Sequence, residues 1–198
     1  NKEIPYDERK DWKEFILIDP LDGTKEFLKR NGEFTVNIAI IRDHFPVAGV
    51  IYAPVPDLLY WGDEENGSWK LENASGQPLQ DDPLVNAKKL PLAKSDSETF
   101  KVVASRSHFS KENEDYINKI KPEGRKLELV SKGSSLKFCL IAEGNADIYP
   151  RLGRTMEWDT AAGHAIAKFA SRKVEVFGED REMEYGKREL GNSWFVVF

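Results

Sequence analysis

The stretch Asp19-Pro20-Leu21-Asp22-Gly23-Thr24 directly follows an apolar run, residues 15–18, that is typical of a β-strand. Pro20 cannot donate to the hydrogen-bonded ladder of a strand, so we expect it to end the strand and let the two carboxylates converge beyond it. Mg²⁺ and other hard cations prefer carboxylate oxygens. The stretch therefore indicates a metal site. Asp-Gly is also a strong hairpin signal, and local sequence alone leaves that alternative open.

A second acidic motif, Trp158-Asp159-Thr160-Ala161-Ala162-Gly163, lies far downstream. Apolar residues from Trp158 to Phe169 recur at helical spacing, which places Asp159 at the start of a helix. An ordinary N-cap is one interpretation of this aspartate. The small residues 161–163 would also let another part of the backbone approach closely, which a surface cap does not require.

Together these motifs resemble the inositol monophosphatase superfamily of metal-dependent, lithium-sensitive phosphomonoesterases. Four segments are similar to its bacterial branch of CysQ-type 3'(2'),5'-bisphosphate nucleotidases. They are IDPLDGTKEFLKRNGEFTVNIAII (18–41), SRSH (105–108), GSSLKFCLIAEGNADIYPR (133–151) and WDTAAGHA (158–165). Inositol phosphatases usually have Asn-Phe after DGT. The resemblance implies an α/β (α+β layered) sugar-phosphatase fold with alternating α and β layers, its N-terminal part missing.

The resemblance also implies roles for the matching residues. Asp19 would bridge two metal ions, and Asp22 and Asp159 would bind the second of these ions. The implied metal ligands are thus Asp19, the main-chain carbonyl of Leu21, Asp22 and Asp159. Gly23 and Thr24 fall where the family binds the substrate phosphate, and Thr24 would help to orient water.

Further substrate contacts are expected in the second half of the chain. A helix is predicted from Leu136 to Glu143, capped by Ser134 or Ser135 and entered through a bend at Gly133. The candidate substrate-binding residues implied here are Ser105, His108, Gly133, Lys137 and Arg151, with Arg106, Ser107 and Arg154 nearby. The alternatives are an ordinary loop histidine, a solvated helix face for the lysine and unspecialised surface arginines.

The activity that the resemblance implies is removal of the 3'-phosphate from adenosine 3',5'-bisphosphate, with two or three Mg²⁺ ions as cofactor. The related 3'-phosphoadenylyl sulfate would be a second substrate, which suggests a role in sulfur assimilation. Inositol monophosphatase activity is the alternative within the family. A metal-binding module without turnover is the alternative outside it.

One expected part of the site is not in the sequence. Family members carry an acidic motif, typically Glu-Glu, upstream of the first strand, and a still earlier Asp that partners the DGT threonine. This chain begins at Asn1, and its Glu3 precedes a polar run (7–10) and is expected at the surface. We therefore expect a truncated protein. Residues 1–198 alone would bind Mg²⁺ or Ca²⁺ weakly with little turnover, and a longer form would be active and lithium-inhibited.

Composition is typical of a water-soluble enzyme. The 198 residues are 40% hydrophobic with a mean hydropathy of −0.55, and no apolar run approaches the ~18 residues that span a bilayer. A single cysteine, Cys139, excludes an internal disulfide and is expected in the core. We expect a cytoplasmic protein, with peripheral association at the inner face of the membrane as a variant. A net charge of −5 argues against nucleic-acid binding. The oligomeric state is not indicated.

The remaining pattern predicts two lobes, a metal-binding lobe at 1–98 and an α/β substrate-binding lobe at 99–198. A short helix is expected at 24–30, and the polar segment 72–98 is expected to be an irregular connection. Further strands are expected at 34–41, 47–53 and 58–61, as an antiparallel meander, and then at 101–104, 127–130, 147–149, 174–177 and 194–198.

Overall fold

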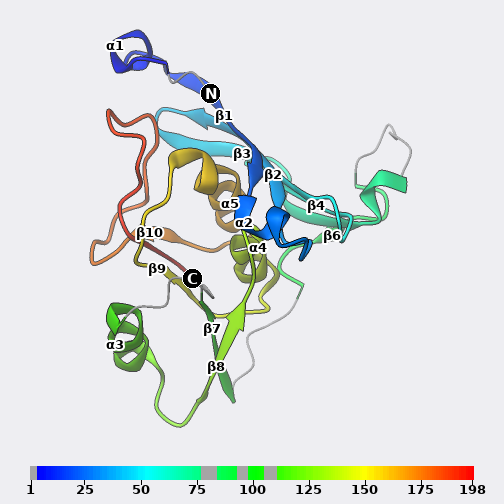
Figure 1. Ribbon diagram of the computed structural model, residues 1–198, viewed down its shortest axis with the longest axis vertical. Helices are drawn as coiled ribbons and strands as arrows, with labels where there is room; N and C mark the ends of the chain where they lie inside the picture. The colour runs from blue at the N-terminus through cyan, green and yellow to red at the C-terminus, as the bar shows by residue number, and fades with distance from the viewer. Residues whose placement is uncertain (1–3, 77–83, 93–97, 105–110) are drawn as a thin grey trace.

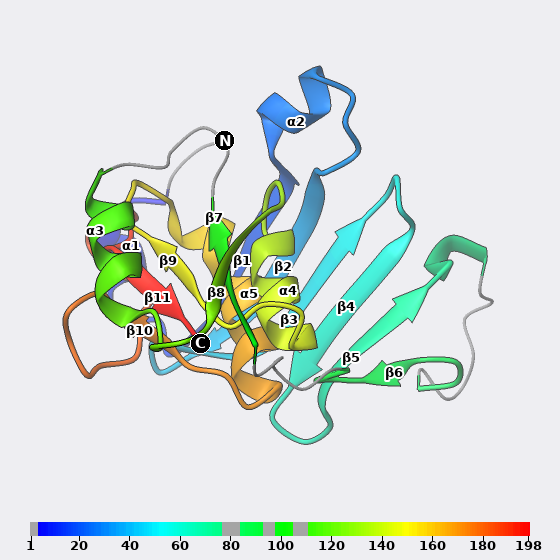
Figure 2. The same ribbon diagram turned by 90° about the horizontal axis from the view of Figure 1, so that it is seen from below.

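The structure, a computed structural model, describes residues 4–76, 84–92, 98–104 and 111–198. Its largest element is a six-stranded antiparallel sheet whose strands lie side by side in chain order (Figure 2). The predicted meander is therefore confirmed. The six strands are β1 (Glu14–Asp22), β2 (Thr35–Arg42), β3 (Phe45–Ala53), β4 (Leu58–Asp63), β5 (Gly67–Glu72) and β6 (Lys88–Lys89).

The prediction that Pro20 ends the first strand is wrong. Strand β1 continues to Asp22, and its pairing with β2 shifts register between Asp19 and Asp22. Asp19 lies opposite Asn37 and Asp22 opposite Thr35, so three steps on β1 match two on β2. This is a bulge on an edge strand, where a proline is tolerated. Strict alternation would send the two carboxylates to opposite faces, and the extra residue lets them face the same side.

Gly23 decides between the metal-site and hairpin interpretations of Asp-Gly. Its φ of +87° is left-handed, and it is the N-cap of the short helix α2 (Thr24–Leu28) rather than part of a two-residue turn. The N–H of Phe27 donates to the Gly23 carbonyl at 2.9 Å. The predicted helix at 24–30 is confirmed and ends two residues early.

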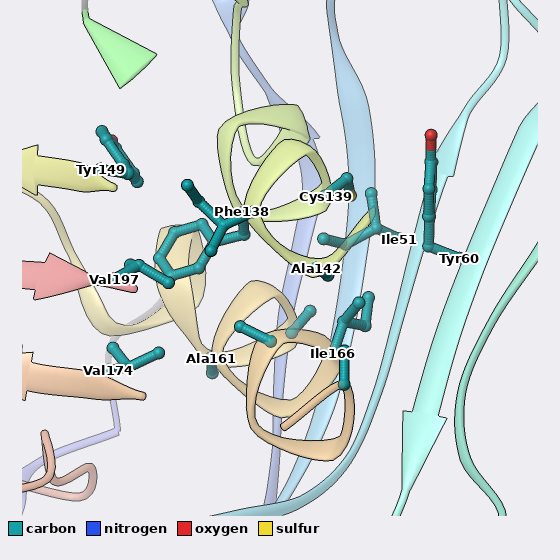
Figure 3. Packing of buried hydrophobic residues seen from close by; sticks show 14 of the residues in the cluster. Ile51, Tyr60, Phe138, Cys139, Ala142, Tyr149, Ala161, Ile166, Val174 and Val197 are labelled. Atoms are coloured by element: carbon teal, nitrogen blue, oxygen red, sulfur yellow. The ribbon is translucent and has the colours of Figure 1, made fainter. Parts of the chain in front are cut away.

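Two helices lie between the large sheet and a second group of strands. Figure 3 shows α4 (Leu136–Glu143) and α5 (Glu157–Phe169) with Ile51 on one side and Val174 and Val197 on the other. The second group is the antiparallel sheet β10 (Val174–Val176), β11 (Phe195–Val197) and β9 (Tyr149–Arg151). The alternating layers implied by the resemblance are confirmed.

The outer part of the second half is built on β7 (Thr99–Ala104) and β8 (Lys126–Ser131), which pair in parallel. Helix α3 (Lys111–Ile120) lies beside them, and α1 (Tyr6–Arg9) lies at the opposite end of the molecule (Figure 1). Within the irregular segment 72–98 the described parts contain the 3₁₀ turn η1 (Ala74–Gly76) and β6. Strand β5, which borders that segment, was not predicted.

Cys139 is 1% exposed, which confirms its core position. One cluster of buried residues draws on both predicted lobes, for example Ile51 of β3 and Phe138 of α4. The lobe boundary at 98 and 99 remains a prediction. None of the helices formed by the described residues has the length and hydrophobicity needed to cross a bilayer.

The small residues of α5 admit close neighbours, as predicted. A Cβ on Gly163 would lie 2.6 Å from Cδ2 of Phe138 on α4, and a Cβ on Gly49 of β3 would lie 2.7 Å from the Ala162 carbonyl oxygen. Such distances leave no room for a side chain. Helix α5 is therefore held tightly against α4 on one side and β3 on the other, which sets the position of its N-terminus.

We expect Gly163→Ala to lower the free energy of unfolding by about 1–2 kcal/mol, because overpacking against Phe138 outweighs the helix propensity gained. Denaturant unfolding measures this change. Gly76→Ala is the control, since a Cβ there would lie more than 4 Å from any other described part of the chain. A Gly163→Ala protein as stable as the unaltered one would contradict the close packing.

Candidate active site

Three carboxylates from two distant parts of the chain meet at one point. Asp19 and Asp22 come from the bulged end of β1 and Asp159 from the first turn of α5, and one oxygen from each lies within 4.8 Å of the others. The described residues contain no second cluster of this kind. A donor set made only of oxygens is what Mg²⁺ requires, so these residues fit a divalent cation.

The electrostatics of the cluster also favour a cation. Burial and the neighbouring charges of Asp159 and Asp19 raise the pKa of Asp22 to about 6. Burial is the main cause that raises the pKa of Asp19 and of Asp159 as well. Three crowded carboxylates disfavour their own ionised forms, and a bound cation would reverse that preference.

Main-chain groups hold one oxygen of each carboxylate. Asp19 Oδ1 accepts the Leu21 N–H at 3.0 Å, Asp22 Oδ2 accepts the Ser135 N–H at 2.7 Å, and Asp159 Oδ2 accepts the Met156 N–H at 2.8 Å. The last bond is part of a capping box at the start of α5. The N-cap interpretation of Asp159 is therefore wrong, because Met156 is the N-cap and Asp159 lies three residues into the first turn. From that position its carboxylate bonds back to the Met156 N–H and faces the other two acids.

A cavity of about 260 Å³ opens beside the cluster. It brings together many of the residues that the sequence singled out, namely Asp22, Gly23, Thr24, Lys137, Arg151 and Asp159. Arg154 is exposed and does not line it, although its carbonyl accepts a hydrogen bond from Arg151 at 3.1 Å. Acidic and basic side chains therefore line the cavity together, and we call the basic pair Lys137 and Arg151 the basic wall.

Lys137 provides much of the basic wall. Its Nζ donates to the Ser134 carbonyl at 2.8 Å and lies 5.9 Å from the centre of the Tyr149 ring. Burial lowers the pKa of Lys137 to about 8, so it remains a cation at neutral pH. The alternative of a solvated helix face is wrong, because this side chain lines the cavity.

The entry to α4 differs from the prediction. No side chain caps this helix, and the left-handed residue is Ser134, with φ of +48°, rather than Gly133. Ser134 Oγ lies 2.9 Å from the Asp22 carbonyl and 2.8 Å from the Glu33 carbonyl. Gly133 is needed for a different reason, because a Cβ there would lie 2.6 Å from the Glu33 carbonyl oxygen. Ser134 therefore ties the second half of the chain to the DGT loop.

Sequence reasoning missed several polar residues of the site. Thr35 and Asn37 lie behind Asp22, and Tyr149 and Thr155 line the cavity. Thr35 and Asn37 occupy the buried face of β2, so polar residues at alternate positions of an otherwise apolar strand were a usable signal. Ser105, Arg106, Ser107 and His108, like Glu3, lie outside the described residues.

Comparison with known proteins agrees with this geometry. Residues 2–178 match the inositol monophosphatase family. The chain is 45% identical over 184 residues to the 3'(2'),5'-bisphosphate nucleotidase CysQ of Salmonella typhimurium, covering 93% of this chain and 67% of that protein. It is 47% identical over 168 residues to the CysQ of Buchnera aphidicola, covering 85% and 57% of the two chains.

Solved structures give the same result. The crystal structure of CysQ from Bacteroides thetaiotaomicron, described as a bacterial member of the inositol monophosphatase family, superposes with a TM-score of 0.92 at 46% identity. The match covers 99% of this chain and 73% of that one. The crystal structure of inositol monophosphatase-II from Staphylococcus aureus shares the fold at 22% identity, with a TM-score of 0.67. The chain therefore belongs to the inositol monophosphatase family.

Proposed function

We propose that the protein is a Mg²⁺-dependent 3'(2'),5'-bisphosphate nucleotidase that hydrolyses adenosine 3',5'-bisphosphate to AMP and phosphate. The observation that carries this proposal is the acidic cluster of Asp19, Asp22 and Asp159 beside a cavity that Lys137 and Arg151 also line. The CysQ relatives, at 44–47% identity, carry the same activity in their names. We propose 3'-phosphoadenylyl sulfate as a second substrate and a role in sulfur assimilation.

The residues that would hold Mg²⁺ are Asp19, Asp22, Asp159 and the main-chain carbonyl of Leu21. When bound, the metal supplies charge neutralisation at the phosphate and a water molecule of lowered pKa. We propose two or three ions in the active form, and inhibition by lithium. Phosphoryl transfer needs little covalent help from protein, so positioning by these side chains would carry much of the rate.

The chain's own polar groups would position the substrate. Thr24, directly after the left-handed Gly23, would orient the attacking water and receive the scissile phosphate with the Gly23 main chain. Lys137 and Arg151 would pair with the second phosphate, because charge-assisted hydrogen bonds to phosphate are stronger than neutral ones. Ser105, His108 and Gly133 would complete the nucleotide site. In this proposal residues 1–98 supply most of the metal ligands, and residues 99–198 add Asp159 and select the substrate.

The bisphosphate is favoured over inositol phosphate because of this basic wall. A substrate with one phosphate would bind at the metal and leave Lys137 and Arg151 without a phosphate to contact. A second phosphate satisfies both. We propose a small-molecule partner only, no nucleic acid, and a cytoplasmic location, with peripheral membrane association as a variant.

The test measures phosphate release by the full-length protein from adenosine 3',5'-bisphosphate and from inositol 1-phosphate, with Mg²⁺ and with excess EDTA. We expect faster release from the bisphosphate and none with EDTA. A preference for inositol phosphate would instead support the monophosphatase alternative. Mg²⁺ binding without release from either substrate would support a metal-binding module.

A further inference from the structure

Three polar side chains are buried directly behind Asp22. Thr35 and Asn37 of β2 are 0% and 1% exposed, and Ser135, just before α4, is 2% exposed. Burying polar groups is costly unless each finds a hydrogen-bond partner. Apolar side chains would fill the same space at a lower free-energy cost. Packing alone therefore does not explain why this trio is polar.

The distances within the trio define a chain of hydrogen bonds. Thr35 Oγ1 lies 2.8 Å from Ser135 Oγ, and Ser135 Oγ donates to Asn37 Oδ1 at 2.8 Å. The Asn37 amide then donates through Nδ2 to Asp22 Oδ2 at 3.4 Å. Each hydroxyl has one proton. Because the Ser135 proton goes to Asn37, the Thr35 proton is directed to Ser135, and its 3.5 Å contact with Asp22 is secondary.

This direction decides which way the Asn37 amide faces. The Ser135 hydroxyl binds the oxygen of the amide, so the NH₂ group is turned toward the carboxylate of Asp22. Without that hydroxyl the amide could turn over and place its oxygen against Asp22, where both groups only accept. The main-chain N–H of Ser135 reaches the same oxygen, Asp22 Oδ2, at 2.7 Å.

The contacts of this group that reach Asp22, from Asn37 Nδ2, the Ser135 N–H and Thr35 Oγ1, all end on its Oδ2. We propose that Thr35, Asn37 and Ser135 are positioning residues that hold Asp22 Oδ2 from behind, so that Oδ1 is presented to the divalent cation. This inference rests on the proposed metal-dependent function. The trio also joins β2 to the segment that leads into α4 and Lys137, so the substrate-binding side of the cavity and the metal ligand share one buried anchor.

The test measures Mn²⁺ affinity of the substrate-free protein by electron paramagnetic resonance, comparing the unaltered chain with Ser135→Ala and Thr35→Val. Both replacements remove a hydroxyl and retain the Ser135 main-chain N–H. Loss of partners that orient a metal ligand typically costs roughly 10- to 100-fold in metal affinity, so we expect binding at least about tenfold weaker in each variant.

Ser68→Ala is the matched control. Ser68 is also fully buried, and its Oγ donates to the Ile166 carbonyl at 2.8 Å, remote from the acidic cluster. This variant loses the same kind of hydrogen bond and a similar amount of stability, but we expect its Mn²⁺ affinity to be unchanged. Thermal unfolding of all variants shows whether a loss of Mn²⁺ affinity goes together with a loss of stability.

The outcomes separate the inference from the proposed function. If the unaltered protein binds Mn²⁺ and Ser135→Ala and Thr35→Val bind it equally well, the positioning role is wrong and the metal site stands. An equal loss of affinity in Ser68→Ala would likewise overturn it, since general destabilisation would then explain the effect. No Mn²⁺ binding by the unaltered protein would overturn both. If Ser135→Ala does not fold, Thr35→Val alone decides.

Discussion

Asp22→Asn and Asp159→Asn in the full-length protein should each lower kcat for adenosine 3',5'-bisphosphate by roughly 10²- to 10³-fold, while the protein stays folded. Each replacement removes a carboxylate charge from the cluster and keeps the shape of the side chain. In the Asp22→Asn protein the new amide oxygen could still accept the Ser135 N–H, which the carboxylate accepts at 2.7 Å. Steady-state kinetics with Mg²⁺ and circular dichroism measure the two properties.

Although Asp22→Asn should lower kcat, it should preserve or raise the stability of the metal-free protein. The folded-state pKa of Asp22 is raised from 3.8 to about 6, so folding disfavours its ionised form. That penalty is absent below pH 3.8, grows as the pH rises and is complete above about pH 6. At neutral pH the uncharged amide avoids it, so we expect Asp22→Asn to unfold at the same or a higher temperature than the unaltered chain.

Asp63→Asn serves as the control for this pair. Asp63 accepts main-chain N–H groups of Glu65 and Asn66 in an exposed turn, at 3.0 and 2.8 Å, and does not belong to the cluster. Its replacement should leave kcat unchanged. Near-normal Mg²⁺-dependent turnover in both Asp22→Asn and Asp159→Asn would show that the metal hypothesis is wrong.

Lys137→Met should raise KM for the bisphosphate by roughly 10- to 100-fold with a much smaller change in kcat. Loss of a hydrogen bond from a charged group costs about 1.5–3 kcal/mol, which corresponds to that range. The effect falls on KM because the proposed contact is with the phosphate that does not react. Methionine keeps the apolar stem that packs near Tyr149, so packing is nearly preserved.

The pH dependence of KM gives an independent check on Lys137. Burial lowers its pKa to about 8, so the cation is present below that pH and is lost above it. We expect KM of the unaltered protein to rise as the pH passes through about 8, and the Lys137→Met protein to lack this rise. Lys29→Met, at the exposed end of α2, is the matched control. An unchanged preference of Lys137→Met for bisphosphate over simple monophosphates would remove Lys137 from the specificity site.

The acidic motifs, the meander and the two helices that carry or flank the site could be predicted from residue types and their spacing. These features are local. The period of apolar residues is set within one helix or strand, and Asp-Pro-Leu-Asp-Gly-Thr is contiguous, so its residue types and spacing could be recognised without knowing what packs against them. The burial of Cys139 was predictable for the same reason.

The way in which the carboxylates are held could not be predicted, because it depends on contacts between distant segments of the folded chain. Asp22 meets the Ser135 N–H across 113 residues of sequence, and the orientation of Asn37 depends on a hydroxyl from that same distant segment. The bulge at Pro20 depends on pairing with β2, and the left-handed turn at Ser134 on its bonds to the Asp22 and Glu33 carbonyls. Such contacts arise when α4 and α5 pack against the sheet, and no local pattern encodes which donor then faces which acceptor.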